Sequence, residues 1–122
     1  MITLTGLRHM TDFRRLEVCE LAHALTLDLY RETRQFPTEE RFGLVSQVRR
    51  AGVSIGANLA EGSGRGSKEF AHYIGMALGS SNELEYLLRV AYDLAYLRAA
   101  SYQERAARVS RMLVGLRRSV RQ

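Results

Sequence analysis

Residues 44–61 read LVSQVRRAGVSIGANLAE and carry more information about the fold than any other segment. Apolar side chains recur every three or four positions, the period of a helix with one buried face. This stripe consists of Leu44, Val48, Ala51, Ile55 and Leu59. A second stripe, of small residues, consists of Gly52, Gly56 and Ala60. Glycine costs a helix interior ~1 kcal/mol relative to alanine, so the second stripe predicts close approach of a neighbour rather than loose packing.

A third line of side chains on the same predicted helix is polar. It consists of Gln47, Arg50, Ser54, Asn58 and Glu61. Buried polar groups must be paired, so this line fits a hydrogen-bond network at a helix or subunit junction. It also fits a groove that binds a ligand or RNA, and we favour the network. Arg49 and Glu83 belong to the same candidate network or interface.

Helical periodicity predicts three further helices, over residues 13–36, 67–97 and from 102 onward, and strand-like alternation is absent from the sequence. Thr38 is expected to cap the second helix, which starts directly after it and runs to about Glu61, and Ser67 is expected to cap the next one. The expected core faces of the last two helices are Phe70, Tyr73, Ala77, Leu84, Leu88, Ala91 and Ala95, then Tyr102, Ala106, Val109, Leu113, Leu116 and Val120. Short connections predict an all-α, antiparallel up-down-up-down four-helix bundle over residues 13–122, after an N-terminal extension at 1–12.

Composition agrees with a folded, cytoplasmic protein. The 122 residues are 46% hydrophobic and 25% charged, which fits one domain and argues against disorder. A single cysteine excludes an internal disulfide and suits a reducing compartment. No apolar run approaches ~18–20 residues, and residues 1–12 are too polar for a secretory signal, so no membrane partner is expected.

Positive charge is concentrated near the C-terminus. The net charge is +5, and residues 105–122 contain six arginines and no acid. These arginines form either a solvated face or a stripe that contacts phosphates, and their number favours the stripe. In the loop at 61–68, Arg65 and Lys68 stand beside glycines near a helix start, where they could hold a phosphate of a polymer. The candidate nucleic-acid contacts are Arg65, Lys68, Arg105, Arg108, Arg111, Arg117, Arg118 and Arg121.

Self-association is predicted from two faces. Leu16 and Leu27 are expected on the side of the first helix that faces away from the core. With Gly52, Gly56 and Ala60 they form the candidate oligomer contact. A closed cyclic homo-oligomer is the simplest assembly that would cover both faces.

Two Glu-x-x-His pairs and a single cysteine are the candidates for metal or catalytic chemistry, and the sequence favours a structural interpretation of each. Glu20 with His23, and Glu69 with His72, have the Glu-x-x-His spacing of di-iron bundles, but helical phase aims neither pair inward. Cys19 is expected to be a buried small side chain rather than a nucleophile. The sequence therefore predicts no catalytic residue, metal, cofactor or small-molecule substrate.

Residues 13–97 resemble the four helix bundle protein family, also called the 23S rRNA intervening-sequence protein family. The match is densest over residues 47–65, and the matching positions include Phe36-Pro37, Glu40, Gly43-Leu44, Gln47, Arg49-Arg50-Ala51, Ser54-Ile55, Asn58 and Ala60-Glu61-Gly62. The resemblance implies a four-helix bundle, a ring of five subunits in the bacterial cytoplasm, and a link to RNA or a ribosome-related ribonucleoprotein. Cys19, Gly52 and Gly56 depart from the family pattern, and the arginine-rich last helix is not a family motif. The alternative function is a protein scaffold without nucleic-acid binding.

Overall fold

The computed structural model describes residues 16–121, and over this range the chain is all-α, without a strand. The four α-helices are α2 (Glu17–Glu32), α3 (Leu44–Gly62), α4 (Ser67–Asp93) and α5 (Ser101–Arg121). Two short 3-10 helices, η2 (Thr33–Gln35) and η3 (Thr38–Glu40), connect α2 to α3. The predicted extension at residues 1–12 and the predicted helix start at Phe13 lie outside the described residues.

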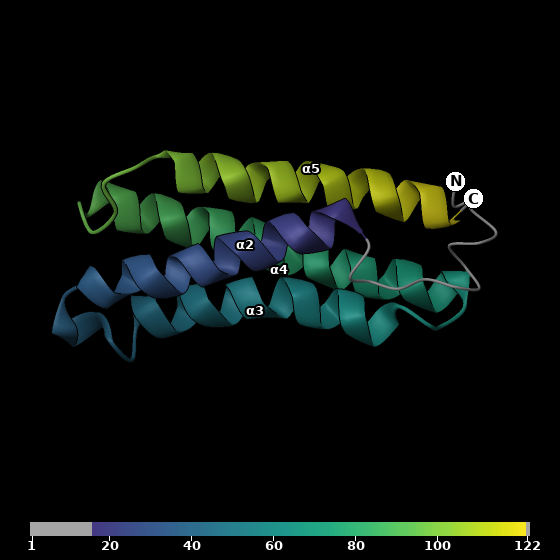
Figure 1. Cartoon of the computed structure of the whole chain (residues 1–122), viewed down its shortest axis with the longest axis horizontal. Helices are drawn as coiled ribbons and strands as arrows, with labels where there is room; N and C mark the ends of the chain where they lie inside the picture. The colour runs from purple at the N-terminus through teal and green to yellow at the C-terminus, as the bar shows by residue number, and fades with distance from the viewer. Residues whose placement is uncertain (1–15, 122) are drawn as a thin grey trace.

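The helices pack side by side around one apolar core (Figure 1). The longest helix, α4, lies against both α3 and α5, while α2 contacts α3 and α5. Within residues 16–121, no helix has the length and apolar character needed to cross a bilayer.

The core confirms the predicted apolar stripes except at Tyr73, which is half-buried outside the core, and at Ala95. All five stripe residues of α3 are buried, and so are Phe70, Ala77, Leu84, Leu88 and Ala91 of α4. On α5 the buried members are Ala106, Val109, Leu113 and Val120, with Tyr102 and Leu116 partly buried against them. Two buried hydroxyls also join α4 to α5, because Ser81 Oγ donates to the Ala106 carbonyl at 3.1 Å and lies 2.7 Å from Ser110 Oγ.

The start of α3 differs from the prediction. Thr38 does not cap this helix but begins η3, and α3 starts six residues later, after Gly43. The N–H of Leu44 instead donates to the Glu40 carboxylate at 3.2 Å. The Glu40 carboxylate therefore accepts a hydrogen bond of the kind expected for the Thr38 hydroxyl. Its negative charge is also favourable at the positive, N-terminal end of the helix dipole.

The ends of α4 also correct the prediction. Ser67 is the first residue of α4 rather than its N-cap. The N-cap is Gly66, and no side chain makes a capping hydrogen bond at this end. At the other end the helix stops at Asp93, and Ala95 adopts a left-handed backbone with φ of 64°. This reversal lets the N–H groups of Tyr96 and Leu97 donate to the Ala91 carbonyl. Leu97 is thereby buried, whereas Ala95, predicted to face the core, is exposed.

Candidate nucleic-acid interface

Three of the six arginines on α5 are balanced by acidic side chains. Arg105 forms an ion pair with Asp28 of α2 at 2.8 Å, and Arg108 pairs with Glu17 of α2 at 3.6 Å. Arg111 pairs with Glu104 on its own helix at 2.9 Å. These pairs are exposed and contribute little to stability, but each places a negative charge beside a predicted phosphate contact. The three acids therefore offset part of the positive charge on the N-terminal part of the arginine face, and Asp28 is shared with Arg31.

The other three arginines, Arg117, Arg118 and Arg121, occupy the C-terminal end of α5. None of them forms an ion pair with an acid of residues 16–121, and neither does Lys68 of α4. Figure 1 shows this end of α5 at the same end of the molecule as the connection between α3 and α4. A hollow of about 470 Å³ there is lined by Ser67, Lys68, Ala71, His72, Arg117 and Arg121. The fold thus gathers four cations at one end of the molecule.

Arg117 is the half-buried member of this cluster. Its guanidinium lies against α4 at Gly75, where a Cβ atom would come within 3.3 Å of Arg117 Cζ. The Nε atom is buried, and the described part of the chain offers it no hydrogen-bond partner. Sequence reasoning missed the contribution of Gly75, because a helix pattern does not show which side chain crosses a glycine on a neighbouring helix.

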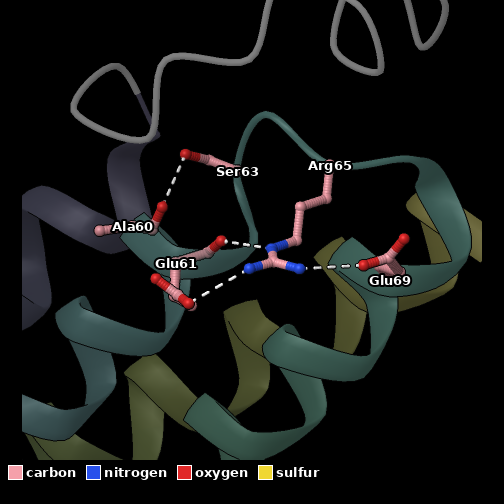
Figure 2. Close-up of polar contacts among 5 residues, drawn as sticks. All are labelled: Ala60, Glu61, Ser63, Arg65 and Glu69. Atoms are coloured by element: carbon pink, nitrogen blue, oxygen red, sulfur yellow. Dashed lines mark hydrogen bonds and ion pairs between the residues drawn. The ribbon is translucent and has the colours of Figure 1, made fainter.

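Arg65 is placed differently from the other candidates, and Figure 2 shows its contacts. Its Nε donates to the Glu61 carbonyl at 3.0 Å, and its terminal nitrogens donate to the carboxylates of Glu61 at 3.2 Å and Glu69 at 3.1 Å. The hydrogen bond to Glu69 is the main reason that the pKa of Arg65 is raised above its ordinary value. Ser63 Oγ also donates to the Ala60 carbonyl at 3.1 Å. Arg65 therefore ties the loop between α3 and α4 to both helices, and two carboxylates offset its charge.

The predicted polar line on α3 separates into parts. Ser54 Oγ lies 2.8 Å from Ser80 Oγ of α4, and Asn58 Nδ2 donates to the carbonyl and hydroxyl of Ser54. These bonds form a small network at the junction of two helices, and Ser80 is the partner that the sequence analysis missed. The rim of an adjacent hollow of about 400 Å³ includes the exposed residues Gln47, Arg50 and Glu83. Glu61 is not part of this network, because it binds Arg65.

Arg49, predicted as a further member of the polar network or interface, contacts the C-terminal end of α2 instead. Its Nε donates to Thr33 Oγ1 at 2.9 Å, and its Nη2 donates to the Tyr30 carbonyl at 3.1 Å. The guanidinium also lies 4.6 Å from the centre of the Tyr30 ring. These contacts place a cation at the C-terminal end of α2, where it complements the helix dipole and binds a terminal carbonyl. Arg49 therefore has a structural role.

The small-residue stripe borders an apolar groove between α2 and α3 with a volume of about 790 Å³. Gly52 is buried, and a Cβ atom there would lie 3.0 Å from Thr26 Oγ1, so the predicted close approach is confirmed at this position. At Gly56 no neighbour from the same protomer approaches, because a Cβ atom would meet nothing within 4 Å, so the predicted close approach there stays a prediction of contact with a second copy. Ala60 and Leu27 are exposed along the same groove.

Leu16 does not belong to the face that carries Leu27. It is half-buried and packs against the core, which contradicts the prediction that both leucines point away from it. The reason is local, because Leu16 flanks α2 with an extended backbone, φ −74° and ψ 127°. Helical phase therefore does not apply at this position.

The residues weighed for catalysis lie as their helical phase predicts. Glu20, His23, Glu69 and His72 are exposed, and Cys19 is buried. In residues 16–121, no three side chains among histidine, cysteine, aspartate and glutamate are grouped so that they could hold a metal ion.

Over residues 16–121, the fold and the charge distribution define an all-α arrangement of four α-helices with an unbalanced basic end. The chain belongs to the 23S rRNA-intervening sequence protein family, whose model matches residues 14–115. This match confirms the family resemblance seen in the sequence. A comparison with curated proteins gave no match.

Proposed function

We propose that this protein is a non-enzymatic, cytoplasmic helical-bundle protein that binds RNA or a ribosome-related ribonucleoprotein. The observation that carries the proposal is the cluster of Lys68, Arg117, Arg118 and Arg121, whose charges no acid of residues 16–121 balances. Phosphates are the ligands that such a cluster attracts, and binding releases the counterions held by the nucleic acid. The family description, which refers to 23S rRNA, supports RNA as the polymer.

The proposal predicts binding that weakens steeply with salt. If the cluster neutralises two phosphates of a single strand, affinity falls roughly sevenfold between about 50 and 200 mM salt. The measurement is fluorescence anisotropy of a labelled RNA titrated with the protein. Changing Arg117, Arg118 and Arg121 together to glutamine should reduce the slope of log affinity against log salt by about 1.

The matched control changes Arg105, Arg108 and Arg111 to glutamine. Both triple variants lower the net charge from +5 by the same amount, yet the control removes arginines that are already paired with acids. We expect the control to bind RNA more tightly than the first triple variant. Equal losses would show that total charge, rather than the basic end, determines binding. Absence of RNA binding, with co-purification of one protein partner, would favour the scaffold function.

We also propose that the protein forms a cyclic homo-oligomer, with a pentamer as the expected ring. The groove between α2 and α3 supports this, because it leaves Leu27, Tyr30 and Val53 exposed beside Gly56. A second copy packed there would remove this apolar surface from water. The antiparallel up-down-up-down arrangement is part of the same proposal, and the short connection at 63–66 between α3 and α4 supports it.

Light scattering tests the assembly. The wild-type mass should be a multiple of 13.8 kDa, and Val53→Asp should lower it by placing a charge in the groove. Met76→Asp is the matched control, since Val53 and Met76 are each 47% exposed and Met76 lies outside this groove. A wild-type mass near 13.8 kDa at micromolar concentration would contradict the oligomer.

A further inference from the structure

Two hollows meet at the basic end and share the same two arginines. One is the hollow lined by Lys68 and His72 at the start of α4, together with Arg117 and Arg121. The other, of about 460 Å³, is lined by Arg118 together with the same Arg117 and Arg121. Arg117 and Arg121 are one helical turn apart on α5, so each hollow receives positive charge from both.

Each hollow has a distinct second wall. The first is bordered by Ser67 and Lys68 in the N-terminal turn of α4, which no side chain caps and where the helix dipole favours an anion. The nearest acid on that turn, Glu69, is bound by Arg65. The second hollow is bordered by Leu78 and Val114, which offer apolar contact to a sugar or a base.

From this arrangement we infer that Arg117 is the centre of a site for two neighbouring phosphates of one RNA strand, one in each hollow. The inference rests on the proposed function and specifies where and how the strand is held. Gly75 is part of the site, because its missing side chain lets the Arg117 guanidinium lie between the hollows. Arg117 thereby contacts both phosphates, as Arg121 does from the next turn of α5, whereas Lys68 and Arg118 each contact one.

The first test alters the position of Arg117 without altering any charge. Gly75→Leu would push the guanidinium off α4, because even a Cβ atom at Gly75 lies 3.3 Å from Arg117 Cζ. The matched control is Gly79→Leu, one turn along α4, where a Cβ atom would meet nothing within 4 Å. In the anisotropy titration, Gly75→Leu and Arg117→Gln should each weaken RNA binding about tenfold, and Gly79→Leu should bind as the wild type does. Circular dichroism checks that each variant is folded.

The second test counts the phosphates. A 5′-phosphorylated dinucleotide carries two neighbouring phosphates, and it should displace the labelled RNA at a lower concentration than the same dinucleotide without the 5′-phosphate. Arg117→Gln should remove this difference. Equal competition by both dinucleotides against the wild type would overturn the two-phosphate site.

The two proposals fail in different ways. If the wild type binds RNA and both Gly75→Leu and Arg117→Gln bind it equally well, the site at Arg117 is wrong and RNA binding stands. If the wild type binds no RNA at about 50 mM salt, where phosphate contacts are strong, the proposed function is wrong, and so is the proposed site at Arg117.

Discussion

Phe70→Ala is expected to lower the free energy of unfolding by about 3–5 kcal/mol. Phe70 is only 2% exposed and lies in the first turn of α4, facing the end of α3. Truncation removes the ring from the core and leaves a cavity that the surrounding helices can fill only in part. A loss of this size is a large part of the ~5–15 kcal/mol that stabilises a typical domain. Urea unfolding followed by circular dichroism at fixed protein concentration measures it.

Phe42→Ala is the matched control for this change. Phe42 lies between η3 and α3 and is 87% exposed, so its truncation should alter stability by no more than about 0.5 kcal/mol. If the two variants lost similar stability, the assignment of Phe70 to the core would be wrong. If Phe42→Ala lost stability only at protein concentrations where the wild type assembles, Phe42 would be a contact between subunits.

Gly62→Ala should also destabilise the protein, by roughly 1–3 kcal/mol, although alanine is the better helix former. A Cβ atom at Gly62 would lie 2.5 Å from Tyr73 Cβ and 3.1 Å from Phe70 Cδ1. Since Tyr73 Cβ is attached directly to the backbone of α4, relief requires that α3 and α4 move apart. Urea unfolding again gives the change in free energy.

The control for Gly62 is Gly79→Ala. Both glycines are in helices, but a Cβ atom at Gly79 meets nothing within 4 Å, so alanine there should raise stability by up to about 1 kcal/mol. A gain at both positions would show that α3 and α4 are not in close contact at Gly62. Combining Gly62→Ala with Phe70→Ala should cost less than the sum of the single changes, because removal of the ring relieves part of the crowding.

Much of the fold was predictable from the sequence because helix periodicity is a local property. The stripe that contains Val48, Ile55 and Leu59 is buried as predicted, and the family match confirms the resemblance carried by residues 47–65. The errors about which way a side chain faces fall where the backbone leaves the helical conformation, at Leu16 and at Ala95. At such positions an angle of 100° per residue no longer tells which way a side chain points.

The candidate site was less predictable, because charge pairing depends on distances between helices. The sequence shows six arginines on one predicted helix, and nothing in their spacing separates Arg108 from Arg118. The structure separates them, since Arg108 lies beside Glu17 and Arg118 shares a hollow with Arg121. Periodicity and composition thus suffice for the helices, their buried faces and the total charge, which are properties of single segments. The location of the unbalanced charge follows from packing, because only packing brings the acids Asp28 and Glu17 of α2 beside the N-terminal part of α5.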